Sequence, residues 1–364
     1  MTRAPALHLV AGFLGSGKTT AIINACKILT AENLRVGVIT NDQGKYLVDT
    51  AFFRLSDLPA VEVRGGCFCC NFVDLEKQLD TLLKTVQPDL IFAESVGSCG
   101  DLVATVVKPL KEFKHDLVTP SSFSVFADAR LLRMRLLNIP LPFSDEVVYI
   151  FDQQIAETNL LVINKIDLVK PAQLEEIKRL AQLRFPEKVL LPQVSLSEAG
   201  ITNWLNLIRS AKTAPIGQSL DMDYARYGQG EQRLAWLDEH IRLRSKKIPL
   251  REAAIHAIAA VMDALKEQRL PIGHVKFLLS GAGDQVVKVS FTTLEQPGWL
   301  ESIPELNGNS LDILINGRVE CSPNQIKELV YNAVRSSAAR DQVEYEVLAS
   351  EAFHPAEPVP THRM

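Results

Sequence analysis

A glycine-rich loop near the start of the chain constrains the fold more than any other feature. Residues 12–19 read Gly-Phe-Leu-Gly-Ser-Gly-Lys-Thr and follow the apolar run 7–11. This pattern is typical of a strand that leads through a phosphate-binding loop into a helix, whose N-terminus and inward-turned N–H groups hold phosphate oxygens. We therefore predict a nucleoside polyphosphate here, with Lys18 at the β- and γ-phosphates and Thr19 on Mg²⁺.

A second motif indicates which nucleotide is bound. Asn164, Lys165 and Asp167 form an N-K-x-D sequence directly after the apolar run 160–163, and ligands gather at the carboxyl ends of strands in open α/β sheets. A carboxylate at Asp167 accepts hydrogen bonds from guanine N1 and the 2-amino group, which adenine cannot donate. The motif predicts GTP. The loop at Ser195 is a candidate to close over the base, and is equally typical of a plain strand-to-helix turn.

A glutamate lies between these motifs, where many nucleotide hydrolases place an acidic residue for magnesium. Glu94 and Gly97 belong to an E-x-x-G sequence that ends the apolar run 89–93. The Glu94 carboxylate would hold a magnesium-bound water or orient the attacking one, and the Gly97 amide would sense the γ-phosphate. The alternative is a solvated glutamate at the end of a strand.

Three thiols within four residues distinguish this chain from a generic GTPase. Cys67, Cys69 and Cys70 are half of its six cysteines and follow the apolar run 60–63. They are able to converge on one cation such as Zn²⁺, at about 2.3 Å per sulfur. Three ligands are one short of a closed tetrahedron, so a water, another side chain or a client protein would supply the fourth. Reduced structural cysteines or a redox pair are the alternatives.

A fourth cysteine lies in the loop after the E-x-x-G sequence. Cys99 is expected to follow a neighbouring strand, so it would be able to complete the metal site in one nucleotide state. A lone cysteine in a loop is more often just a small apolar residue. The sequence leaves both interpretations open.

Taken in this order, the motifs resemble those of the CobW-type GTPases of the cobalamin-biosynthesis and zinc-metallochaperone group, which are similar to the nickel chaperones of urease and hydrogenase. The resemblance covers about residues 5 to 212. It implies metal contacts at Cys67, Cys69 and Cys70, and GTP turnover that drives metal delivery. The nucleotide-binding residues that we predict are Gly12, Gly15, Ser16, Gly17, Lys18, Thr19, Thr20, Gly97, Asn164, Lys165, Asp167 and Ser195.

The chain also departs from this family. Members commonly read N-E-F-G-E after the second strand, whereas this chain has Asn-Asp-Gln-Gly-Lys at 41–45. We expect Asp42 to assist Glu94 around magnesium and the water, whereas Lys45 replaces a carboxylate with a cation. The seven histidines are scattered, which argues against a histidine tract that buffers zinc.

Composition excludes several kinds of partner. Lys plus Arg number 39 against 43 Asp plus Glu, a formal charge of −4, and no basic stripe indicates nucleic acid or an anionic membrane. No apolar run approaches the roughly 18 residues that span a bilayer, and no signal-peptide core is visible. These features predict a cytoplasmic protein whose partners are a client metalloprotein and, as a possibility, a second copy of itself.

Periodicity predicts two domains. Short apolar runs alternate with helical periods to about residue 210, which is typical of a mostly parallel α/β sheet in a P-loop NTPase domain over 1–212. A linker is expected at 213–230, where Pro, Gly and Ser interrupt both periodicities. Residues 231–364 predict a smaller α+β, ferredoxin-like domain with the order α-β-β-β-α-β, and the last dozen residues look frayed.

The function that these features favour is a GTP-hydrolysing metallochaperone or metal insertase, with Lys18, Glu94 and Asp42 as catalytic residues. Zinc is preferred over cobalt and nickel as the metal. Hydrolysis is expected to be slow until a partner or metal completes the site, because no arginine lies in the phosphate loop and the nearest, Arg64, precedes the cysteines. The alternatives are a G-protein-type activator of a metalloenzyme with structural cysteines, and a metal-storage module.

Overall fold

The computed structural model describes residues 4–42, 48, 58–64, 66–210, 216–283, 285–296 and 298–364, without the side chains of Asp42 and Arg64. These residues divide into two compact units, each described here by itself. The first unit holds the described residues of 1–43, 56–230 and 357–364, and the second those of 44–55 and 231–356.

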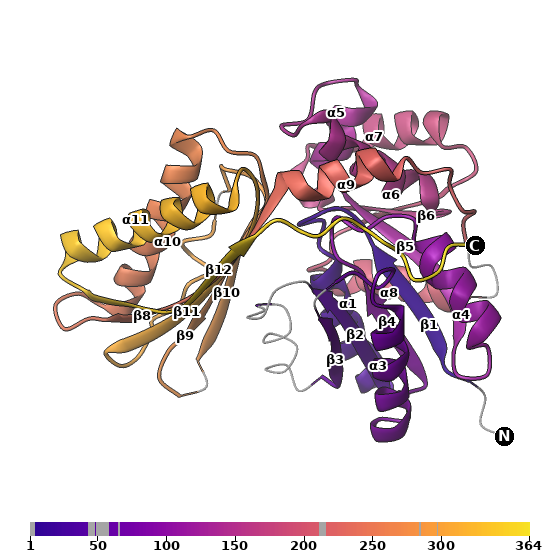
Figure 1. Ribbon diagram of the computed structural model, residues 1–364, viewed down its shortest axis with the longest axis horizontal. Coiled ribbons are helices and arrows are strands. Elements are labelled where there is room, and N and C mark those ends of the chain that lie inside the picture. The colour runs from indigo at the N-terminus through magenta and orange to yellow at the C-terminus, as the bar shows by residue number, and fades with distance from the viewer. Residues whose placement is uncertain are drawn as a thin grey trace. The chain divides into compact units, whose positions relative to one another are not determined.

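A parallel sheet of seven strands forms the centre of the first unit, and it confirms the predicted fold class (Figure 1). The strand order is β3-β2-β4-β1-β5-β6-β7, and every neighbouring pair is parallel. Every residue of β4 and β6 is buried, as expected where helices cover both faces of a sheet. The strands are β1 (Ala6–Ala11), β2 (Val36–Asp42), β3 (Ala60–Arg64), β4 (Leu90–Glu94), β5 (Thr119–Asp128), β6 (Leu160–Asn164) and β7 (Val189–Gln193).

Helices alternate with these strands along the chain (Figure 1). A π-helical turn, η1 (Val103–Val107), runs into α4 soon after the end of β4; such turns are often found at functional sites. The helical segments are α1 (Lys18–Ala31), α3 (Phe72–Thr85), η1 (Val103–Val107), α4 (Lys108–Phe113), α5 (Ala129–Leu136), α6 (Asp145–Glu157), η2 (Ile166–Leu168), α7 (Pro171–Arg184), α8 (Glu198–Arg209) and α9 (Tyr224–Arg233).

The second unit is an antiparallel sheet of five strands in the order β10-β9-β11-β8-β12, together with two helices. Its core consists of the alternate apolar residues of the strands and one face of each helix. The elements are β8 (Leu234–Arg244), α10 (Leu250–Glu267), β9 (Ile272–Ser280), β10 (Val286–Phe291), β11 (Ser310–Glu320), α11 (Pro323–Asp341) and β12 (Glu344–Phe353).

The predicted α+β class is confirmed for the second unit, but the predicted element order was incomplete. Strand β8 precedes α10 and pairs with both β11 and β12, so the order is β-α-β-β-β-α-β. The interruption of the β8 pattern by Asp238, Glu239 and His240 hid this strand. Helix α9 lies largely in the stretch that was expected to be a linker.

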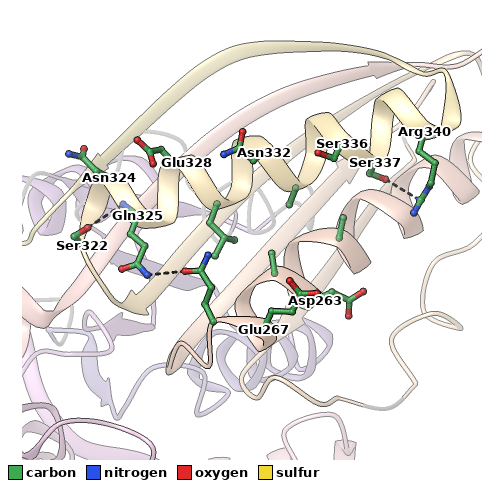
Figure 2. A pocket seen from close by; sticks show the side chains of 15 residues that line it. Asp263, Glu267, Ser322, Asn324, Gln325, Glu328, Asn332, Ser336, Ser337 and Arg340 are labelled. Atoms are coloured by element: carbon green, nitrogen blue, oxygen red, sulfur yellow. Dashed lines mark hydrogen bonds between the residues drawn. The ribbon is translucent and has the colours of Figure 1, made fainter.

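A groove lies between α10 and α11 in the second unit (Figure 2). Polar side chains such as Asp263, Asn332 and Arg340 line it together with several alanines. Because its lining comes from these helices and the turns beside them, the residues predicted to bind nucleotide or metal lie elsewhere.

Residues 357–364, drawn in yellow at the end of the ribbon, return to the first unit and end beside α4 (Figure 1). They were expected to be frayed, yet the Met364 amide bonds the Ala104 oxygen at 3.0 Å and the Thr361 amide bonds the Cys69 oxygen at 2.8 Å. Among the described residues, no helix is both long and apolar enough to cross a membrane.

Candidate functional site

The phosphate loop has the backbone that its sequence requires. Gly12, Gly15 and Gly17 have φ angles of 130°, 68° and 95°, a region that residues with a side chain rarely adopt. A Cβ atom on Gly12 would lie 2.1 Å from the Phe126 oxygen. The ammonium of Lys18 donates to the Gly12 oxygen at 2.8 Å, which holds this buried cation at the loop.

The side chain of Asn164 fastens the base-recognition motif to the phosphate loop. Its Nδ2 donates to the Ser16 oxygen at 2.7 Å, while its Oδ1 accepts from the Ser195 amide at 3.0 Å and from the Ser195 hydroxyl at 2.9 Å. A Cβ on Gly17 would lie 2.3 Å from the same Nδ2. Asn164 and Ser195 therefore fix the relative positions of three loops, a role that the sequence did not reveal.

Thr19 and Glu94 face each other as a magnesium site requires. The Thr19 hydroxyl donates to Oε1 of Glu94 at 2.7 Å, and both residues are buried. A hydroxyl and a carboxylate beside a phosphate loop are the hard oxygen ligands that Mg²⁺ prefers. These two side chains fit the ion, which Thr19 would bind directly with Glu94 behind it.

Two basic side chains, Lys165 and Arg130, interact electrostatically with Asp167 and pair with Asp128. Lys165 lies 3.3 Å from Asp128, and Arg130 pairs with the same carboxylate at 2.6 Å. Burial lowers the pKa of Lys165. Burial alone would raise the pKa of Asp128, but the hydrogen bonds from Arg130 and the nearby positive charges outweigh this effect and hold the pKa below its usual value. Asp167 itself is exposed in η2 and is free to face a base. Asp128, the last residue of β5, and Arg130, in the first turn of α5, carry no motif that sequence reasoning detects.

The cysteine loop is shaped by Asn41 at the end of β2. Its Nδ2 donates to the Gly66 oxygen at 2.7 Å, and its Oδ1 accepts from the Phe68 amide at 2.8 Å. The loop then turns back sharply, since the Cys70 amide bonds the Cys67 oxygen at 3.1 Å, and α3 follows. These bonds bring the sulfurs of all three cysteines to one side.

Four sulfurs gather at this point. The ligand atoms of Cys67, Cys69 and Cys99 lie within 4.8 Å of one another, and all three residues are buried. The Sγ of Cys70 lies 3.1 Å from that of Cys67 and 3.7 Å from that of Cys69. Sulfurs bound tetrahedrally to one zinc ion lie about 3.8 Å apart, given a bond of about 2.3 Å. The structure thus brings Cys99, which the sequence left undecided, into the cluster.

Contact between neighbouring thiols, together with burial, raises the pKa values of Cys69 and Cys70. Hydrogen bonding with Cys67 and then with Cys70 raises the pKa of Cys69 well above its usual value, and contact with Cys67 together with partial burial raises that of Cys70 to about 11. No disulfide joins them, because all four cysteines are free. A divalent cation would replace these protons with its own charge.

One segment carries both the nucleotide and the thiol residues. Residues 94–101 run from Glu94 through Gly97 to Cys99, and the side-chain amide of Gln154 donates to the Gly97 oxygen at 3.0 Å and to the Cys99 oxygen at 2.8 Å. A Cβ on Gly97 would lie 3.0 Å from Cα of Leu14 in the phosphate loop. A movement of the phosphate loop that displaces Gly97 would therefore be transmitted to Cys99, two residues further along the chain. Gln154 has no sequence signature for this role.

Some of the predicted site residues have no side-chain geometry to report. The side chains of Asp42 and Arg64 lie outside the described residues, as do Gly65 and Lys45. The catalytic role given to Asp42 therefore stays a prediction. Thr20 follows Thr19 in the first turn of α1 and is half-buried.

Comparison with known proteins agrees with these features. Residues 6–190 match the model of the CobW/HypB/UreG nucleotide-binding domain. Zinc chaperone YeiR of Escherichia coli (strain K12) is 31% identical over 184 residues, which cover 49% of this chain and 51% of that protein. Zinc chaperone CobW of Sinorhizobium sp is 24% identical over 221 residues, with 55% and 61% covered.

A further relative aligns with more of the chain. Zinc-regulated GTPase metalloprotein activator 1 of Dictyostelium discoideum is 24% identical over 334 residues, which cover 83% of this chain and 64% of that protein. The chain thus spans between about half and just under two thirds of the length of these three relatives. Because the family model matches half of the chain, and because the phosphate loop, N-K-x-D motif and cysteine loop lie where that model aligns, the chain belongs to the CobW/HypB/UreG nucleotide-binding family.

Proposed function

We propose that this protein is a GTP-hydrolysing metallochaperone that carries zinc on Cys67, Cys69, Cys70 and Cys99 and delivers it to a client metalloprotein. The observation that carries the proposal is the 94–101 segment, which contains a magnesium-side glutamate, a glycine against the phosphate loop and a thiol of the metal cluster. A storage protein would not need this connection to a nucleotide.

The nucleotide half of the proposal assigns GTP to the glycine loop and Asp167. Lys18, which bonds the Gly12 oxygen here, would bind the β- and γ-phosphates, and Thr19 would hold Mg²⁺, which when bound would supply positive charge beside the transferred phosphoryl group. Glu94 then keeps the Thr19 hydroxyl and the attacking water in place. No arginine contributes from the loop itself, so turnover stays slow without a partner or bound metal.

The metal half of the proposal rests on chemistry and spacing. Three buried sulfurs within 4.8 Å of one another, with the sulfur of Cys70 beside two of them, suit a thiophilic ion that takes tetrahedral ligands. Zinc is preferred because its filled d shell imposes no coordination geometry, so the ion readily accepts a tetrahedral set of thiolates. Cobalt and nickel remain alternative cargoes. The names of the three relatives, two of them zinc chaperones, favour the same metal.

Metal analysis tests this proposal. Protein purified under reducing conditions with GTP or GDP should contain about one zinc per chain, and Cys67→Ser, Cys69→Ser and Cys99→Ser should each lower this ratio. Cys321→Ser is the matched control, because this partly buried cysteine lies in the second unit, outside the cluster. Equal zinc in wild type and in the Cys67, Cys69 and Cys99 variants would overturn the metal site.

A client pull-down distinguishes delivery of zinc to the client from activation of the client by binding alone. If the protein acts as a G-protein-type activator, a client captured in one nucleotide state would be retained and activated equally by the Cys67→Ser variant. For a metal carrier, capture without zinc transfer is expected from that variant, and radioactive zinc would appear in the client only with the wild-type chain.

A further inference from the structure

Residues 357–364 lie directly on the cysteine loop. The backbone amide of Val359 donates to Sγ of Cys70 at 3.3 Å. Two residues later, the Thr361 amide donates to the Cys69 oxygen at 2.8 Å and the Thr361 hydroxyl to the Cys70 oxygen at 3.1 Å. This segment therefore contacts two of the four cysteines through two backbone amides and one hydroxyl.

The same segment is anchored at its other end. Arg363 donates to the fully buried carboxylate of Asp101 at 2.7 Å and to the Leu220 oxygen at 2.8 Å, and its guanidinium lies over the Tyr224 ring. Asp101 also accepts from the Tyr224 hydroxyl at 2.6 Å. Because the Asp101 carboxylate is fully buried, loss of Arg363 would leave its charge poorly compensated, which is costly.

Ring contacts fill the space between these two ends. His362 packs edge-on against Phe72, the first residue of α3, with 5.0 Å between ring centroids, and lies 5.1 Å from Phe113 of α4. The side chain of Val359, in contrast, is 74% exposed. At position 359, then, the backbone N–H makes the contact and the side chain does not.

We propose that residues 359–363 form an outer shell of the zinc site, in which the Val359 amide orients Cys70 toward the ion and the segment as a whole blocks its departure. The inference rests on the proposed function, and it adds that zinc leaves only after this segment lifts from the cysteine loop. Cys70 is the natural exit point, since it is the one half-buried thiol of the four.

Two physical arguments support this role. An N–H group that donates to a thiolate bound to a metal fixes its direction and stabilises its charge, and loss of such outer partners typically costs 10–100-fold in metal affinity. Furthermore, Asp101, which anchors Arg363, lies two residues after Cys99 in the 94–101 segment. A movement that begins at the phosphate loop would therefore displace both residues 359–363 and the metal ligand Cys99.

A pair of substitutions at one position tests the amide. Val359→Pro removes the N–H, whereas Val359→Ala retains the N–H and changes only a side chain that is largely exposed. Proline is compatible with this position because Val359 already precedes Pro360, which favours extended conformations at residue 359. Each full-length variant is loaded with zinc, and transfer of zinc to an excess of a chromogenic chelator is followed by stopped flow.

The expected result is that Val359→Pro releases zinc about 10–100-fold faster than both Val359→Ala and wild type, while each binds the same number of zinc ions when zinc is in excess. Arg363→Gln, which weakens the anchor at the other end, should also accelerate release, and Arg363→Lys should do so less. Melting temperatures of the zinc-free variants report whether each is folded.

Equal release rates from the folded Val359→Pro and Val359→Ala variants would overturn the outer shell and leave the four-thiol carrier intact. If wild type binds no zinc at all, the carrier itself is wrong, and this inference falls with it. Slow release from wild type that persists in both Val359→Pro and Arg363→Gln would mean that the ion leaves by another route, which also contradicts the inference.

Discussion

The hydroxyl of Thr19 lies 2.7 Å from Oε1 of Glu94. These residues come from the start of α1 and from the end of β4, and β4 is the direct parallel neighbour of β1 in the sheet. Because the carboxyl ends of β1 and β4 meet at the same edge, the phosphate loop and the E-x-x-G sequence are brought together by strand pairing alone. Two motifs that are 75 residues apart thus form one site.

Glu94→Gln is expected to lower the rate of GTP hydrolysis by about 100-fold or more, because the amide cannot hold the water and the magnesium shell as a carboxylate does. Binding of a fluorescent GTP analogue should change far less. Single-turnover phosphate release measures the first quantity and fluorescence titration the second. Thr19→Ser, which keeps the hydroxyl, is the control, and hydrolysis by Glu94→Gln at the wild-type rate would contradict the role of Glu94.

Asp167→Asn should weaken GTP binding by about 5–150-fold, the equivalent of the roughly 1–3 kcal/mol that a buried mismatched polar group costs. Xanthosine triphosphate, whose 2-oxo group suits an amide donor, should bind this variant better than it binds wild type. Competition against a fluorescent nucleotide measures both affinities. Asp116→Asn, which changes an exposed carboxylate beside His115, provides the control. Unchanged GTP affinity in Asp167→Asn would mean that another residue recognises the base.

Stability should depend on pH through Glu157 at the end of α6. Burial raises the pKa of this fully buried carboxyl to about 8, from 4.5. The folded chain therefore binds more protons than the unfolded chain between these values, so stability is greatest below pH 4.5 for this group and falls as pH rises toward 8, by at most about 1.4 kcal/mol per pH unit. Thermal melting of the Glu157→Gln variant should lose this part of the pH dependence, whereas Glu187→Gln at an exposed site should keep it. Parallel profiles for wild type and Glu157→Gln would refute the assignment.

The strands of the first unit could be predicted because each is a short apolar run bounded by polar loops. A strand buried on both faces needs apolar residues throughout, so the runs that end at Glu94 and Asn164 are visible without any alternation. Strand β8 was missed because Asp238 and Glu239 interrupt its pattern while remaining buried in the second unit. Burial of charged residues depends on long-range partners that a local pattern does not contain.

The candidate site was predictable to the same extent. The glycine loop, the N-K-x-D motif of Asp167 and the three clustered cysteines can be recognised from the spacing of their residues along the sequence, which is a local property. Cys99 could not be decided, because its membership depends on the path of the loop that follows β4. Neither Gln154 nor the 357–364 segment has a motif, and both act through backbone oxygens or amides that any sequence supplies.

Metal and nucleotide should affect each other's binding. The Gln154 side chain bonds both the Gly97 and Cys99 oxygens, and Gly97 lies against Leu14, so we expect a shift of Gly97 toward the γ-phosphate to move Cys99. We expect zinc affinity to differ by about 5–150-fold between protein loaded with GDP and protein loaded with a non-hydrolysable GTP analogue, and zinc to change the ratio of the two nucleotide affinities by the same factor, since coupling is reciprocal. Titration of zinc against a strong chelator in each state measures the ratio of the two zinc affinities.

Gln154→Met should bring this ratio closer to one, while Gln153→Met, at the preceding position of α6, should leave the ratio unchanged. Equal zinc affinities in both nucleotide states of the wild-type chain would show that the two sites act independently, and the protein would then bind metal without being driven by GTP.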